Sequence, residues 1–76
     1  MPSLDQLRVG QQARINSVAG ADALVQRLLE MGLVDGEQLE VVGVAPLGDP
    51  IEVRLRDYRL SLRRTEAARI HVEILP

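Results

Sequence analysis

The chain contains no cysteine. This absence excludes disulfide bonds, iron–sulfur clusters and thiolate zinc sites, and it favours a cytoplasmic protein because small secreted domains usually depend on disulfides. No segment has the pattern of a signal peptide, and no apolar run approaches the roughly 18 residues that a membrane-spanning helix needs. Direct insertion into a membrane is therefore not expected.

Aromatic residues are almost missing, and lysine is missing altogether. Tyr58 is the only aromatic residue, so the core must be built from Leu, Val, Ile and Ala. All nine basic residues are arginines, and eleven acidic residues bring the net charge to −2. Such a balance does not by itself indicate a nucleic-acid-binding surface, and the lack of aromatic stacking residues counts against binding to single strands.

What the sequence does contain is a regular series of short strands within one domain, residues 1–76. Alternating or continuous apolar patterns predict strands at residues 12–18, 38–44, 51–55, 58–62 and 70–75. An apolar arc at helical spacing predicts the main helix within residues 20–32, with Asp22 near its start. Gly32 is expected to end this helix in a left-handed conformation, with Leu33 folded back on it, and a single helical turn is expected within residues 64–69.

The short connections require the last four strands to pair antiparallel. We therefore expect a mainly β fold, a small SH3-like five-stranded barrel. The helix between the first and second strands would cap one open end of this barrel, and the short helical turn would precede the last strand.

A two-residue turn after Leu55 would pair this residue with Tyr58. The alternation then directs Tyr58, and Ile74 on the last strand, toward the core. The same register places Arg54 opposite Arg59 on the outer face, which is unfavourable for like charges.

Two prolines and a glycine, Pro46, Gly48 and Pro50, lie between the second and third strands. We expect a stiff connector in which Leu47 and Gly48 form the centre of a type II turn and Pro50 holds Asp49 extended. Leu47 is apolar near the tip of this loop, where a polar residue would serve. Two interpretations stay open: the side chain folds back on the barrel, or it faces a partner.

Most of the chain, from about Leu4 to Leu75, resembles the FeoA family of the bacterial ferrous iron uptake system. The resemblance rests on an ordered set of segments: Arg27-Leu28, Met31-Gly32-Leu33, Gly36, Pro46-Leu47-Gly48-Asp49-Pro50-Ile51, Leu62-Arg63, Glu66-Ala67 and Ile70-His71-Val72. It implies an SH3-like barrel and a role beside FeoB, the membrane transporter with a cytoplasmic GTP-binding domain, which FeoA proteins are thought to bind and modulate. The hairpin tip departs from the family, which often carries glycine there, and Asp57 is expected to tolerate the left-handed region.

The residues do not support an enzyme, a cofactor site or a dedicated metal site. None of the hydroxyl side chains lies in a catalytic motif, and no glycine-rich phosphate loop is present. His71 is the only histidine, whereas an iron site needs several ligands at one locus. The acidic residues near Asp35 are equally well explained as a solvated turn.

Two surfaces are candidates for binding a partner. The first is basic and centres on Arg54 and Arg59, although neighbouring glutamates could neutralise it. The second is apolar and consists of Leu47, Gly48 and Asp49 in the connector with Leu29 and Met31 at the edges of the helical arc, unless these last two belong to the core.

The main interpretation is a non-enzymatic accessory protein of ferrous iron uptake that binds the cytoplasmic part of FeoB and is recruited by it to the inner face of the membrane. One alternative is a stand-alone regulatory domain related to the C-terminal SH3-like domain of metal-dependent repressors. Another is a general protein- or nucleic-acid-binding barrel. Weak self-association also stays open, because small barrels have exposed strand edges.

Overall fold

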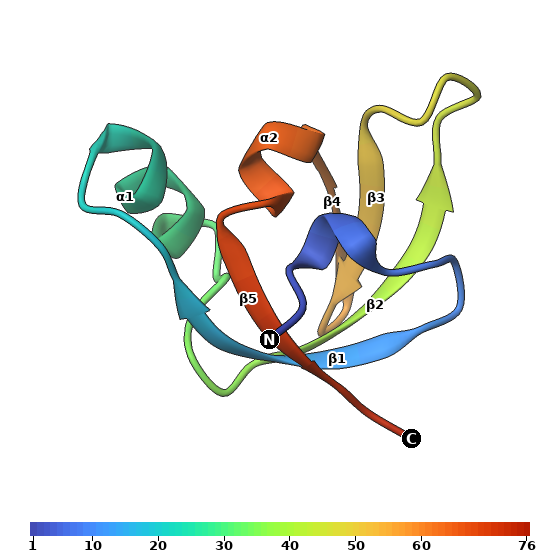
Figure 1. Ribbon diagram of the computed structural model, residues 1–76, viewed down its shortest axis with the longest axis horizontal. Coiled ribbons are helices and arrows are strands. Elements are labelled where there is room, and N and C mark those ends of the chain that lie inside the picture. Colours follow the sequence, from blue (N-terminus) through green and yellow to red (C-terminus); the bar gives the residue numbers. More distant parts are fainter.

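The computed structural model describes residues 1–76 and contains five strands with two short α-helices (Figure 1). In chain order the elements are the 3₁₀ turn η1 (Leu4–Gln6), β1 (Gln12–Val18), α1 (Ala23–Glu30), β2 (Gln38–Val44), β3 (Ile51–Leu55), β4 (Tyr58–Leu62), α2 (Arg64–Ala67) and β5 (Ile70–Ile74). The predicted strands are confirmed, with β5 one residue shorter than expected. The main helix is confirmed but begins later than its apolar pattern suggested.

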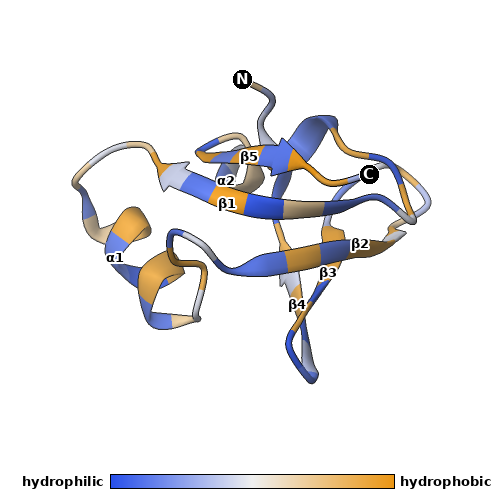
Figure 2. Ribbon diagram, turned by 90° about the horizontal axis from the view of Figure 1, so that it is seen from below, coloured by the Kyte–Doolittle hydropathy of each residue, from blue (hydrophilic) through white to orange (hydrophobic).

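The strands form one antiparallel sheet in the order β4-β3-β2-β1-β5. The two edge strands, β4 and β5, are joined through α2 but do not pair with each other, so the sheet is not closed into a complete ring. Figure 2 shows hydrophobic and hydrophilic residues alternating along the strands and around α1, as expected for elements that bury one face.

Asp22 and Gly32, the residues that the sequence indicates near the two ends of helix α1, cap it in the structure. Asp22 is the N-cap, and its side chain accepts a hydrogen bond from the Val25 N–H at 3.3 Å. Gly32 has a φ of 97°, and the N–H of Leu33 donates to the carbonyl oxygen of Leu28 at 3.2 Å. With the bond from the Gly32 N–H to Leu29, this is a Schellman motif, and it delivers Leu33 into the core with no exposed surface.

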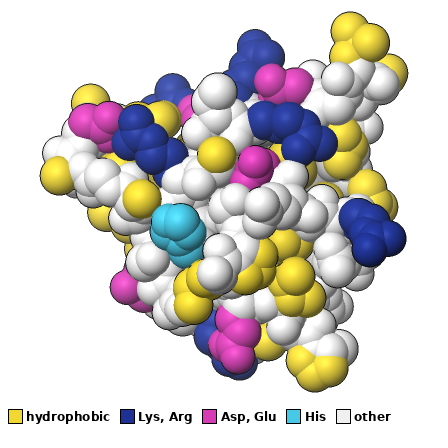
Figure 3. All heavy atoms as spheres, in the orientation of Figure 1, with side chains coloured by type: hydrophobic (Ala, Val, Ile, Leu, Met, Phe, Trp, Pro, Cys, Tyr) yellow, Lys and Arg dark blue, Asp and Glu magenta, His cyan; other side chains and the backbone are white.

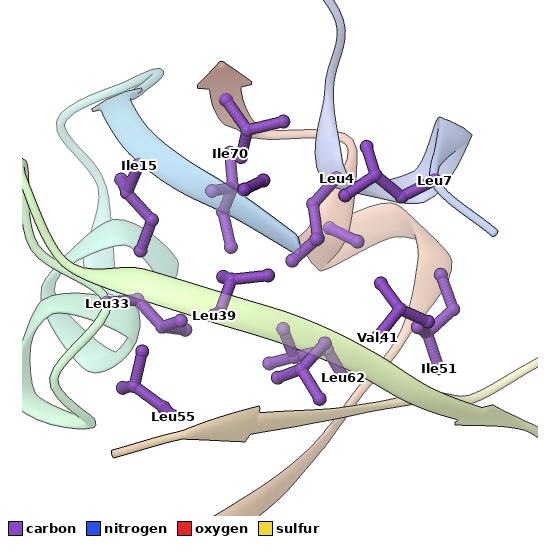
Figure 4. Close-up of a cluster of buried hydrophobic side chains, with 14 of the residues drawn as sticks. Leu4, Leu7, Ile15, Leu33, Leu39, Val41, Ile51, Leu55, Leu62 and Ile70 are labelled. Atoms are coloured by element: carbon purple, nitrogen blue, oxygen red, sulfur yellow. The ribbon is translucent and has the colours of Figure 1, made fainter. Parts of the chain in front are cut away.

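The core is a single aliphatic cluster of 15 buried residues (Figure 4). Leu4 and Leu7 enter it from the N-terminal segment, and Ile15, Leu62 and Ile70 enter it from the strands. Branched aliphatic side chains fill such a space densely without polar atoms to satisfy, which accounts for a stable core without aromatic residues.

Two inward assignments from the alternation are wrong. Tyr58 is 38% exposed, because it lies beside the hairpin tip, where its hydroxyl donates a hydrogen bond to the Met31 carbonyl oxygen at 2.6 Å. Ile74 is 43% exposed, because it pairs with Ala13 at the end of the ladder between β1 and β5, where the chain leaves the sheet. Alternation shows on which face of the strand a side chain lies, but it does not show how far the rest of the molecule covers that face.

Ion pairs connect α1 to the other end of the chain. The Arg69 guanidinium donates to both carboxylate oxygens of Asp22, at 2.9 and 3.1 Å, and these hydrogen bonds hold the pKa of Asp22 below its usual range. Arg27 pairs with the buried carboxylate of Glu66, which also accepts the Arg63 N–H at 2.8 Å. The exposed pair contributes little stability, whereas the buried carboxylate of Glu66 needs both of its partners.

The hairpin between β3 and β4 has the predicted register, with Leu55 opposite Tyr58 and Arg54 opposite Arg59. The residue in the left-handed region is Arg56, with a φ of 59°, and the expectation that Asp57 would adopt this conformation is wrong. In a two-residue hairpin the first loop position is often glycine because it takes a positive φ. Arg56 occupies it nonetheless and pairs with Glu37.

The backbone conformation at Arg56 leads to a prediction. R56G and R56A both remove the ion pair, but only the glycine also relieves the left-handed conformation. We expect R56G to melt roughly 4–8 °C above R56A, as measured by thermal unfolding at neutral pH. Equal melting temperatures would mean that this turn stores no backbone strain.

Candidate docking surfaces

The connector between β2 and β3 is held in one conformation by its own backbone. The N–H of Gly48 donates to the Ala45 carbonyl oxygen at 2.7 Å, and the N–H of Ala45 donates to the Pro50 carbonyl oxygen at 3.0 Å. The hydrogen-bonded turn therefore has Pro46 and Leu47 at its centre, which corrects the prediction of Leu47 and Gly48. Gly48 follows the turn and takes the expected positive φ, 91°.

Arg64, the first residue of α2, fixes this connector to the body of the domain. Its backbone N–H donates to the Asp49 carboxylate at 3.1 Å, and its side-chain Nε donates to the Gly48 carbonyl oxygen. Its Nη1 donates to the Asp5 carbonyl oxygen in η1 at 2.8 Å. Gly48 and Asp49, two of the predicted docking residues, therefore anchor the loop.

Leu47 does not fold back on the domain. The residue is 98% exposed, more than any other large hydrophobic residue in the chain. Figure 1 shows the connector projecting from the rest of the molecule, and Figure 3 shows hydrophobic atoms at its tip. A single exposed leucine is common on protein surfaces, but this one is presented by a loop that proline, backbone hydrogen bonds and Arg64 hold in place.

The helix edge does not add to this surface. Leu29 is 36% exposed, whereas Met31 is half-buried and packs against the core. Figure 1 shows α1 on the opposite side of the molecule from the connector. Leu47 therefore does not form one apolar surface with Leu29 and Met31.

The basic candidates lie on the outer face of β3 and β4. Arg54 pairs with Glu40 of β2, and Arg59 has its nearest carboxylate, that of Glu52, at 3.7 Å. These glutamates offset the repulsion between the two arginines, which face each other across the ladder. Arg54 thus belongs to a close ion pair, while Arg59 is only loosely neutralised, with a side chain that is 62% exposed.

A polar hollow of about 400 Å³ lies beside Arg54, between β2 and the hairpin. Arg54 and Arg56 line it together with Glu37 and Glu40. Hydrogen bonds from Arg56 hold the pKa of Glu37 below its usual range. The hollow therefore carries two internally paired arginines and offers no excess charge to a small ionic ligand.

No group of three or more His, Asp or Glu side chains in the chain could hold a metal ion. His71 is half-buried on β5, opposite Ser17, and its side chain reaches the surface (Figure 3). We expect no stoichiometric micromolar binding of Fe²⁺ in anaerobic calorimetry. A tight one-to-one isotherm that His71→Ala abolishes would contradict this prediction.

A family model described as the FeoA domain matches residues 3–74. A curated relative from Porphyromonas gingivalis, named as a fusion of Fe²⁺ transport protein A with the Fe²⁺ transporter FeoB, is 47% identical over 72 residues. The match covers 95% of this chain and only 8% of that relative.

Solved structures give the fold. The FeoA protein of Chlorobium tepidum is 45% identical with a TM-score of 0.90, and the match covers 99% of this chain and 71% of that one. The zinc complex of Stenotrophomonas maltophilia FeoA, described as an SH3 domain protein, is 34% identical with a TM-score of 0.84, covering 96% and 91% of the two chains. The predicted SH3-like fold is confirmed. A manganese-dependent transcriptional repressor, at 20% identity and a TM-score of 0.89 with 97% of this chain and 36% of that one covered, shares the fold alone.

None of the helices has the length and apolar character required to cross a membrane.

Proposed function

Because the chain belongs to the FeoA family, we propose that it is an accessory protein of ferrous iron uptake that binds the cytoplasmic part of the FeoB transporter and modulates its GTP turnover. The observation that carries this proposal is the fusion relative, in which a region 47% identical to this chain is joined covalently to the transporter. Fusion holds two domains at a high effective concentration, which benefits partners that act on each other. FeoA domains are small SH3-like accessory domains rather than catalysts.

The proposed place of action is the inner face of the membrane. The partner would bring the protein there, since the chain has no helix of its own that could span the bilayer. The alternative, a repressor-like regulatory domain, is supported by the shared fold but by no particular residue or motif of this chain.

The proposed contact is made by Leu47, with Arg54 and Arg59 as the rival surface. A rigid, fully exposed leucine can enter a pocket of the partner without losing much loop entropy, because the loop is already ordered. Arginines on the outer face would instead attract an acidic surface, and that attraction would fade as salt screens it.

A pull-down with the cytoplasmic part of FeoB, with and without guanine nucleotide, tests the function. We expect the wild-type chain to retain the transporter fragment and L47D to lose it, because a charged side chain in an apolar pocket is unfavourable. V34D is the matched control, since Val34 is also exposed but lies in the turn after α1. Absence of retention by the folded wild-type chain in every nucleotide state would contradict the proposed function.

Salt dependence separates the two surfaces. If Leu47 makes the contact, binding should change little between low and high salt, and R54E/R59E should bind as the wild type does. Binding that fades with salt and fails in R54E/R59E would assign the contact to the arginine face instead. If neither L47D nor R54E/R59E binds less tightly while both stay folded, both surfaces are wrong.

A further inference from the structure

Strand β4 forms an open edge of the sheet. It pairs only with β3, and no backbone hydrogen bond outside the strand ladder involves residues 58–62. In a two-residue hairpin the pair next to the turn, here Leu55 and Tyr58, is hydrogen-bonded, and bonded and non-bonded pairs then alternate. The backbone N–H and C=O groups of Arg59 and Ser61 therefore point away from β3, toward the open edge.

The chain protects its other edge but not this one. The N-terminal segment covers β5, where the N–H of Val72 donates to the Pro2 carbonyl oxygen at 2.9 Å and Ser3 forms a bridge with His71. Proteins usually blunt a free edge with charged side chains, proline, a bulge or a covering segment, and of these β4 has only the charge of Arg59. Strand β4 contains no proline, and its register with β3 has no shift, whereas the β1–β5 and β2–β3 ladders each have one.

The charged side chains beside this edge indicate which charge an added strand should carry. Across the outer face, Glu40, Arg54 and Arg59 lie in line on three neighbouring strands. Glu40 pairs with Arg54, which leaves Arg59 next to the open edge with only the 3.7 Å contact to Glu52. A carboxylate directly opposite Arg59 on an added strand would continue this row with a favourable cross-strand pair.

A small hollow indicates which side chain fits the neighbouring position of the added strand, opposite Ser61. It has a volume of about 280 Å³ and lies on the same face, between the base of the connector and β4, where Ser61 and Glu52 are its polar lining and Val44, Ala45 and Pro50, with Gly43, contribute apolar surface. An added antiparallel strand bonds directly opposite Arg59 and Ser61. Because side chains two residues apart share a face of a strand, the residue two before the carboxylate would reach this hollow. Its size and lining suit a small apolar side chain.

We propose that the β4 edge binds an extended acidic segment of a partner protein by strand addition. The segment bonds to the backbone of Arg59 and Ser61, places a carboxylate opposite Arg59, and places a small apolar side chain over the hollow beside Ser61. A second copy of this chain is a poorer occupant, because its own edge strand, Tyr58–Leu62, carries an arginine and no acid. The inference does not rest on the proposed function, since any protein with such a segment would fit.

The test uses a synthetic probe, the blocked heptapeptide Ser-Val-Ala-Val-Glu-Val-Ser, in which alanine precedes glutamate by two residues, titrated into the ¹⁵N-labelled full chain. We expect amide exchange to slow at Arg59 and Ser61. Replacing Glu by Lys in the peptide, or methylating the backbone nitrogen of that Glu, should each weaken binding about tenfold. R59E should reverse the preference and select the lysine peptide, and S61P should lose affinity without unfolding, because the Ser61 N–H lies outside the ladder with β3.

Equal binding of the glutamate and lysine peptides would overturn the proposal, as would unchanged binding of the N-methylated peptide. Slowed exchange confined to other strands would also refute it. A chain that forms dimers by itself, and returns to monomers with S61P, would show that the edge serves a second copy. R59E distinguishes a specific contact from a folding defect, because a variant that merely unfolds could not gain affinity for the lysine peptide.

Discussion

L28A should lower the free energy of unfolding by about 2–5 kcal/mol, a large share of the stability of a domain of this size. Leu28 has no exposed surface and belongs to the central cluster. Its carbonyl oxygen also accepts the Leu33 N–H that closes the end of α1, so the residue lies where the helix, its cap and the core meet. Truncation to alanine leaves a cavity that the neighbouring strands cannot fill without moving.

The adjacent residue provides the control. L29A makes the same chemical change one position along the helix, where the side chain is 36% exposed, and should cost roughly 1 kcal/mol or less. Denaturant unfolding of both variants gives the comparison. If L28A is no more destabilising than L29A, Leu28 is not packed in the central cluster as described.

G32A should be the most damaging glycine substitution, at about 2–4 kcal/mol. Gly32 has a φ of 97°, and a methyl group on its Cα would overlap the Tyr58 hydroxyl oxygen. That hydroxyl donates to the Met31 carbonyl oxygen, so alanine would disturb both the end of α1 and its contact with the hairpin.

Gly36 separates the cost of the left-handed backbone conformation from the cost of the overlap with Tyr58. It has nearly the same φ, 91°, but a methyl group there would meet nothing within 4 Å. G36A should therefore cost only the backbone term, on the order of 1–2 kcal/mol, and G32A should exceed it. In the Y58F background, where the hydroxyl is absent, the excess should shrink. Equal costs for G32A and G36A in the wild-type background would contradict the packing of Tyr58 on the helix end.

Most of the fold could be predicted because its signals are local. Alternation defined the strands, the two-residue loop fixed the register of Leu55 with Tyr58, and Asp22 and Gly32 marked the helix ends. The inward assignments of Tyr58 and Ile74 are wrong because the alternation continues to the ends of these strands, whereas the parts of the molecule that cover the inner face do not reach that far. Asp57 tolerates the left-handed region better by its own chemistry, but the loop position that takes the positive φ is occupied by Arg56.

The candidate surfaces were less predictable because they depend on contacts between distant parts of the chain. No sequence pattern shows that Arg64 reaches Asp5, Gly48 and Asp49, although these contacts fix the connector. The sequence identified Leu47 as unusual but could not decide its direction. The openness of the β4 edge likewise follows only from the strand order, since Tyr58–Leu62 reads as an ordinary alternating strand.

The most direct test of the proposed function is an NMR titration of the ¹⁵N-labelled chain with the unlabelled cytoplasmic part of FeoB. We expect the largest changes on residues 45–50, around the exposed Leu47, and we expect L47D to remove them. Changes confined to α1 and its following turn, or a spectrum unaltered at saturating concentrations of folded partner, would contradict this expectation.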